Sequence, residues 1–138
     1  MKTFDHDKME AGFYLAGEDT FGNRTFDLRM RKPNSDDLIA PPALHSTEHM
    51  LAEAFRTSEA ADKVVYVGPM GCRTGFYVLL NKIDFDDALQ LTVRCVQNAL
   101  AMPGVPFSSR KECGACAEHD YAGARRELTK YFALLKNL

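Results

Sequence analysis

Two histidines and a glutamate lie close together in the segment LHSTEHMLAEAF, residues 44–55. His45 and His49 are four residues apart, so on a helix they share one face, and Glu48 lies next to them. Two imidazoles about 5–6 Å apart at Cβ can bind the same metal ion. Glu48 is then placed to transfer a proton beside a metal-bound oxygen. The spacing predicts a metal site; the simpler alternative is a solvent-facing pair of histidines.

Two histidines do not complete a site, because a catalytic zinc-type centre has three protein ligands and one open position. The segment ECGAC, residues 112–116, offers Cys113 or Cys116 as a thiolate third ligand. Their C-x-x-C spacing alone is also typical of a redox pair or a zinc knuckle, but a knuckle needs a second cysteine pair and the sequence has none. A set of two histidines and one cysteine predicts a catalytic metal.

A further thiol lies in the segment GPMGCRTGF, residues 68–76, where Cys72 is flanked by glycines and precedes Arg73. Gly71 and Gly75 allow tight turns and close backbone approach. A thiol on such a turn is accessible, and a neighbouring cation or metal favours the thiolate. Cys72 is therefore either a catalytic thiol or an incidental residue of a hairpin turn. Cys95, in the middle of an apolar helical pattern, is expected in the core.

The elements that must position these residues follow from hydrophobic periodicity and turn signals. Strands are expected at residues 12–17, 24–31, 63–69 and 74–81, the last two as a hairpin, and helices at about 43–57, 84–102 and 117–137. Paired strands with helices between them favour an α+β fold, an antiparallel sheet with helices packed on it. With 138 residues, the chain is expected to form a single domain, residues 1–138.

Composition excludes several classes of partner. The net charge is −2, with acidic and basic residues mixed, so a nucleic-acid or anionic-membrane partner is not expected. No apolar run approaches the roughly 20 residues of a membrane span, and the opening MKTFDHDKME has no signal-peptide pattern. We expect a cytoplasmic protein, in which the four cysteines act as ligands, nucleophiles or core residues and not as disulfides.

Together these segments resemble the LuxS family, the S-ribosylhomocysteine lyases. HSTEH is similar to the family's H-x-x-E-H, GPMGCRTGFY to its P-M-G-C-[RQ]-T-G-[FY], and ECGAC to the C-G that completes its metal site. Asp5–His6 and FDLRM around Arg29 also fit, and the order and approximate spacing agree over nearly the whole chain.

The resemblance implies a metal-dependent carbon–sulfur lyase with a LuxS-like fold. It implies that His45, His49 and Cys113 hold a divalent metal, iron(II) natively, with zinc or cobalt as functional substitutes. Cys113, and not Cys116, is the match because it precedes a glycine. Cys116 is an additional thiol that could form a disulfide with Cys113 on oxidation.

The other matched residues would act on the substrate. The resemblance implies that Cys72 and Glu48 transfer protons and that His6 and Arg29 contact the substrate. It assigns no role to His119, for which we expect a position at the surface or beside the metal ligands. Family members usually have a serine shortly before the Asp-His pair, and Thr3 is the candidate to replace it.

The implied reaction cleaves the thioether of S-ribosylhomocysteine by carbonyl migration and β-elimination. The products are homocysteine and 4,5-dihydroxy-2,3-pentanedione, the precursor of autoinducer-2, so the implied role is in quorum sensing or methyl-cycle recycling. The family also implies a homodimer with both active sites at the interface. Two alternatives remain open: a small inverzincin-type metallopeptidase, which shares the H-x-x-E-H order, and a non-enzymatic metal or redox module built on Cys113 and Cys116.

Overall fold

The computed structural model describes residues 4–138, and its strands form one four-stranded antiparallel sheet. Along the sheet the strands lie in the order β1-β2-β4-β3. Their bounds are Gly12–Glu18 for β1, Asn23–Arg29 for β2, Val64–Pro69 for β3 and Gly75–Asn81 for β4. All four strands and the hairpin of β3 and β4 lie where the sequence predicts them.

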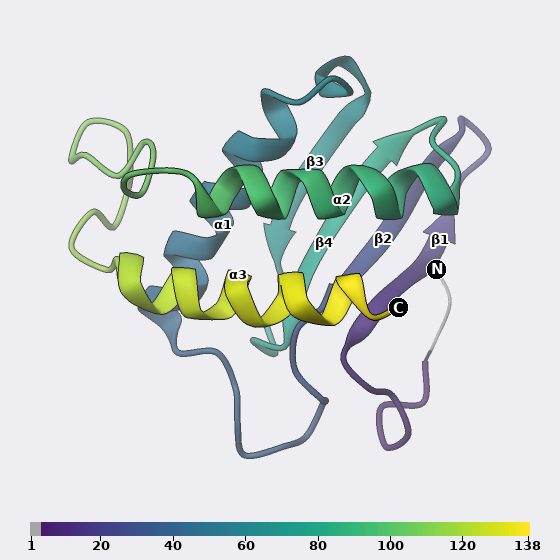
Figure 1. Ribbon diagram of the computed structural model, residues 1–138, viewed down its shortest axis with the longest axis horizontal. Helices are drawn as coiled ribbons and strands as arrows, with labels where there is room; N and C mark the ends of the chain where they lie inside the picture. The colour runs from purple at the N-terminus through teal and green to yellow at the C-terminus, as the bar shows by residue number, and fades with distance from the viewer. Residues whose placement is uncertain (1–3) are drawn as a thin grey trace.

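Three helices pack on this sheet: α1 (Pro41–Arg56), α2 (Phe85–Leu100) and α3 (Tyr121–Lys136), with a short 3-10 helix, η1 (Ala61–Lys63), before β3. In Figure 1, α2 and α3 run antiparallel in front of the sheet, and α1 contacts both of them and β3. Within residues 4–138, none of the helices combines the length and the apolar character that a bilayer crossing requires.

The core lies between the sheet and the helices. Phe26 and Leu28 of β2 pair in register with Val78 and Phe76 of β4, and all four are fully buried on one face of the sheet. Their side chains join those of the helices in one hydrophobic cluster. This arrangement confirms the predicted α+β architecture with an antiparallel sheet.

The starts of two helices differ from the prediction. Pro41 and Pro42 form the first turn of α1 and do not precede it, which fits the fixed φ of proline. The last helix begins at Tyr121, because the side chain of Asp120 accepts the Gly123 amide at 2.9 Å and caps the helix. Residues 117–120 therefore belong to the preceding loop.

The turn between β3 and β4 requires a glycine at position 75. A Cβ placed on Gly75 would lie 2.2 Å from the carbonyl oxygen of Leu28 on the neighbouring strand β2. The same placement on Gly71, in the same turn, meets nothing within 4 Å. The close approach of two backbones at Gly75 fixes where the turn that carries Cys72 leaves the sheet.

We expect Gly75→Ala to lower the free energy of unfolding by roughly 1–3 kcal/mol, because strand β2 must shift to accommodate the methyl group. Gly71→Ala is the matched control and should stay within about 0.5 kcal/mol of the parent. Urea unfolding of the two variants measures the difference. Equal midpoints for the two variants would contradict the close approach at Gly75.

Candidate functional site

Helix α1 carries three of the predicted site residues on neighbouring positions. The rings of His45 and His49 lie edge to face, with centroids 4.8 Å apart, as expected for residues one turn apart. Met50 and Leu51, which follow His49 in the sequence, are fully buried and pack the helix against the core. The helix thus holds both imidazoles on one face toward the loop that follows α2.

Backbone carbonyl groups set the orientation of both rings. His45 Nδ1 lies 2.8 Å from the Glu118 carbonyl oxygen, and His49 Nδ1 lies 2.8 Å from that of Pro106. A carbonyl oxygen only accepts hydrogen bonds, so each Nδ1 carries the proton and each Nε2 is left with a lone pair. This is the form in which histidine binds metals.

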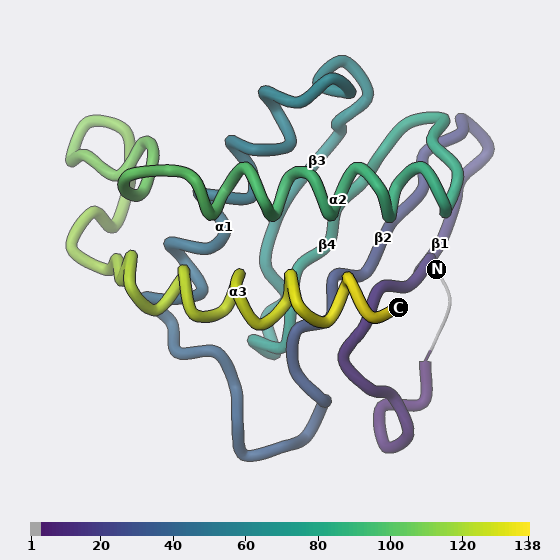
Figure 2. Tube along the Cα trace, viewed as in Figure 1, coloured from purple at the N-terminus to yellow at the C-terminus, as the bar shows by residue number. Residues whose placement is uncertain are grey.

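The loop between α2 and α3 brings a sulfur to these two nitrogens. Figure 2 shows the loop extending past the ends of the helices before it returns to α3. Cys113 Sγ lies 3.4 Å from His45 Nε2 and 3.9 Å from His49 Nε2. Nitrogen and sulfur ligands of one tetrahedral ion lie roughly 3.5 Å apart, so the three donors fit a metal site.

A fourth donor lies in the same group. His119 Nε2 is 3.5 Å from Cys113 Sγ, and the ring of His119 stacks on that of His45 with centroids 4.0 Å apart. Burial, followed by the charges that His45 and His49 can carry, lowers the pKa of His119. His119 lies beside Cys113 and His45 and is partly exposed. The Asp120 helix cap was the sequence signal that could have put it in the loop with Cys113.

We call His45, His49, Cys113 and His119 the donor cluster; their ligand atoms all lie within 4.8 Å of one another. Three imidazole nitrogens and a cysteine sulfur favour a transition metal over calcium or magnesium.

Glu48 lies between His45 and His49 in the sequence and lines a cavity next to them. Together with His49 it lines a cavity of about 380 Å³, which also includes Glu53, Arg56 and Phe107. Glu48 and His49 of the donor cluster therefore line the same space, which a small molecule can enter.

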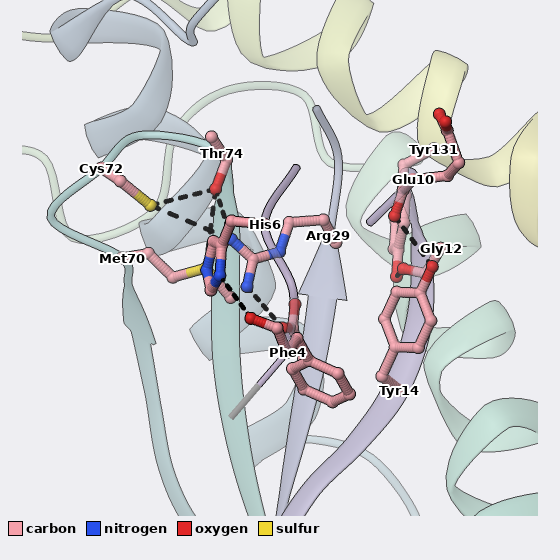
Figure 3. A network of polar contacts seen from close by, with 11 residues as sticks. Phe4, His6, Glu10, Gly12, Tyr14, Arg29, Met70, Cys72, Thr74 and Tyr131 are labelled. Carbon is pink, nitrogen blue, oxygen red and sulfur yellow. Dashed lines mark hydrogen bonds and ion pairs between the residues drawn. The ribbon is translucent and has the colours of Figure 1, made fainter. Parts of the chain in front are cut away.

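The turn with Cys72 meets Arg29 of strand β2 through Thr74. Arg29 Nη1 donates to Thr74 Oγ1 at 2.7 Å, and Thr74 Oγ1 lies 3.0 Å from Cys72 Sγ. Because Thr74 accepts from Arg29, its own hydroxyl hydrogen can be donated to the sulfur. Arg29 Nη1 itself lies 3.9 Å from Cys72 Sγ, and Figure 3 shows this network. A hydroxyl and a cation thus face the exposed thiol of Cys72.

Arg29 also forms a buried ion pair with Asp27, whose Oδ2 lies 2.6 Å from Arg29 Nη2. Burial raises the pKa of Asp27, while the hydrogen bond and charge of Arg29 and the charge of His6 act in the opposite direction. Asp27 Oδ1 and Arg29 Nε are buried and have no hydrogen-bond partner among residues 4–138. The pair fixes the guanidinium beneath the Cys72 turn.

His6 lies in the same region, near the start of the chain. It is exposed, its Nδ1 is 2.8 Å from the carbonyl oxygen of Phe4, and Figure 3 shows it drawn with the Arg29 and Cys72 network. Thr3 lies outside the described residues.

The predicted site residues therefore form two groups, the donor cluster with Glu48 and the Cys72 turn with Arg29 and His6. Among residues 4–138, no hydrogen bond or ion pair joins these groups directly. A backbone hydrogen bond links the elements that carry them: the Ile39 amide, just before α1, donates to the Arg73 carbonyl oxygen at 3.0 Å. The turn with Cys72 is thereby attached to the start of the helix with His45 and His49.

The remaining two thiols differ in environment. Cys95 is fully buried, and burial raises its pKa to about 12, which confirms the predicted core position. Cys116 is partly exposed in the same loop as Cys113 and does not belong to the donor cluster.

Comparison with known proteins extends the likeness over the whole chain. Residues 2–137 match the family described as S-Ribosylhomocysteinase (LuxS). An S-ribosylhomocysteine lyase of Borreliella afzelii (strain PKo) is 38% identical over 144 aligned positions, covering 99% of this chain and 90% of the relative. A protein of the same name from Listeria monocytogenes serotype 4b (strain CLIP80459) is 40% identical over 127 positions, covering 88% of this chain and 80% of the relative. Another, from Dichelobacter nodosus (strain VCS1703A), is 34% identical and covers 96% of this chain and 88% of the relative.

Proposed function

The chain belongs to the S-ribosylhomocysteinase (LuxS) family, and we propose that it cleaves the thioether of S-ribosylhomocysteine. The products are homocysteine and 4,5-dihydroxy-2,3-pentanedione, the precursor of autoinducer-2. The observation that carries the proposal is the family match over residues 2–137, which includes the donor cluster, Glu48 and the Cys72 turn. A peptidase or a redox module uses only part of this set.

We propose that His45, His49 and Cys113 hold the catalytic metal, iron(II) natively, with zinc or cobalt as substitutes. The two Nε2 lone pairs and the sulfur, 3.4 and 3.9 Å apart, support this choice. When bound, the ion supplies Lewis-acid stabilisation of negative charge on a sugar oxygen. Reduced thiol ligands fit the cytoplasmic location that we propose.

Proton transfer falls to Cys72 and Glu48 in this proposal. Moving the carbonyl along the sugar, and then eliminating homocysteine, requires protons to be removed from carbons next to a carbonyl group. The Cys72 sulfur, which Thr74 and Arg29 both contact, is one base. Glu48, beside the donor cluster and open to the cavity, is the second. A base on each side of an extended sugar chain allows both proton shifts without turning the substrate.

We propose that His6 and Arg29 bind the substrate. His6 is exposed near the Cys72 turn, and the guanidinium of Arg29 lies 3.9 Å from the sulfur that acts on the sugar. A cation and an imidazole near that sulfur can donate hydrogen bonds to hydroxyl or carboxylate oxygens of S-ribosylhomocysteine.

We further propose a homodimer with the two active sites at the interface. The exposed apolar side chains Val65 and Tyr66 of β3, which are 53% and 50% accessible, support an interface on the sheet. A partner there would also bring further side chains toward the two groups of site residues, which share no hydrogen bond or ion pair among residues 4–138.

The test is release of homocysteine thiol. Protein loaded anaerobically with iron(II) or cobalt(II) is incubated with S-ribosylhomocysteine, and the new thiol is titrated with a chromogenic disulfide. We expect one thiol per substrate consumed, and no cleavage of a panel of peptides. Metal-loaded protein that releases no thiol would contradict the proposed function.

A further inference from the structure

The donor cluster contains one more metal-binding side chain than a catalytic site uses. His119 Nε2 lies 3.5 Å from Cys113 Sγ, as close as the nitrogens of His45 and His49 at 3.4 and 3.9 Å. If all four residues bound the ion, a four-coordinate site would be closed to substrate. The distances to the sulfur do not show whether His119 binds the metal as His45 and His49 would. The hydrogen-bond partner of its Nδ1 can show this.

The Nδ1 partners of the three rings differ in kind. His45 and His49 each meet a backbone carbonyl oxygen, which can only accept. His119 Nδ1 instead lies 2.9 Å from the hydroxyl oxygen of Ser46, which can donate or accept. The proton position on His119 therefore follows from what else binds the Ser46 hydroxyl.

The Ser46 hydroxyl has one further contact among the described residues. It is completely buried, and its oxygen accepts the Asp120 amide at 2.8 Å. An amide can only donate, so the hydroxyl hydrogen needs an acceptor elsewhere, and a buried hydrogen without one is costly. Within residues 4–138, His119 Nδ1 is the acceptor in contact with this hydroxyl. Ser46 donates to His119, and the ring proton is on Nε2, the atom directed at Cys113.

We propose that His119 donates a hydrogen bond from Nε2 to the Cys113 sulfur and does not bind the metal, with Ser46 fixing this tautomer. The inference rests on the metal site of the proposed function. A hydrogen bond to a thiolate ligand withdraws charge from the sulfur. The ion consequently remains a stronger Lewis acid than two imidazoles and an unmodified thiolate would leave it, and a coordination position remains for a sugar oxygen.

The first test measures whether His119 donates a hydrogen bond to the Cys113 sulfur. In cobalt(II)-loaded protein, the thiolate-to-metal charge-transfer band reports the energy of the sulfur lone pairs. We expect His119→Phe, which removes the donor, to shift this band to longer wavelength. His119→Gln keeps an N–H donor and should restore the band most of the way to the parent position. An unchanged band in His119→Phe would overturn the proposal.

The second test measures whether Ser46 keeps the ring proton of His119 on Nε2. Ser46→Ala removes the hydroxyl, so His119 can carry its proton on Nδ1 and bind the ion through Nε2. Proton NMR of the cobalt(II) form should then show three strongly shifted, exchangeable ring N–H signals of bound imidazoles, against two in the parent. Thr47→Val is the matched control, since Thr47 is equally buried on α1 but, among residues 4–138, its hydroxyl donates to the Ala43 carbonyl oxygen and not to a histidine. Three bound imidazoles in the parent, or two in Ser46→Ala, would overturn the proposal.

Neither readout uses the substrate. Protein with the expected band shift and signal count but no thiol release would contradict the proposed function and leave the role of His119 intact.

Discussion

Cys72→Ser should lower the rate of thiol release from S-ribosylhomocysteine by roughly 10²–10⁴-fold, the usual effect of losing a general base. A serine hydroxyl is a much weaker acid than a thiol, so neither Thr74 nor Arg29 can hold it as an anion. The serine hydroxyl still fits the turn, whose position depends on Gly75 and on the backbone hydrogen bond between Ile39 and Arg73. Metal content should therefore equal that of the parent.

Cys116→Ser is the control for this change, because it also replaces a partly exposed thiol but lies outside both groups of site residues. Assayed anaerobically, it should turn over at about the parent rate. A Cys72→Ser variant that turns over as fast as this control would show that another group removes the protons. Loss of metal from Cys72→Ser would instead show that the two groups are linked more closely than their contacts indicate.

The second large effect is expected for Cys113→Ala, which should lose both metal and activity. Removal of a residue that only orients a ligand costs roughly 10–100-fold in metal affinity, and removal of a ligand should cost more. His45 and His49 remain in place, because carbonyl groups of Glu118 and Pro106 hold their rings. Equilibrium competition with a chromogenic chelator measures the affinity.

The matched control for the ligand is Cys116→Ala, three residues along the same loop. It should keep the parent affinity, since Cys116 is not part of the donor cluster. Metal loss in Cys116→Ala with retention in Cys113→Ala would reverse the assignment of the sulfur. The two large effects are also distinguishable from each other, because activity is lost with the metal bound in one and with the metal absent in the other.

Local patterns were sufficient to predict most of the fold. Alternating apolar residues in β2, and the β-branched and aromatic runs of β3 and β4, identify strands because their periodicity matches the register that buries Phe26 and Leu28. The four-residue spacing of His45 and His49 works in the same way, since one helix positions both rings. In each case a single element determines the outcome.

The contacts that were missed join distant parts of the chain. The sequence predicts His119 at the surface or beside the metal ligands, and the Asp120 cap, which starts the helix at Tyr121, leaves His119 in the loop with Cys113. Ser46 is an ordinary helical residue in the sequence, and its hydrogen bond reaches a residue 73 positions away. The hydrophobic periodicity of a single element does not predict such a pairing, because the pairing depends on how α1 packs against α3.

One hydrogen bond joins the last helix to the first strand. Tyr131 Oη donates to the carbonyl oxygen of Gly12 at 2.9 Å, across 119 positions of sequence. During synthesis on the ribosome α3 emerges after β1 and the other helices, so the edge of β1 gains this partner only after α3 has left the ribosome. Cys113 and His119 leave the ribosome just before that helix, long after His45 and His49. A nascent chain therefore exposes His45 and His49 without a sulfur beside them until Cys113 has emerged, and the donor cluster forms only after that.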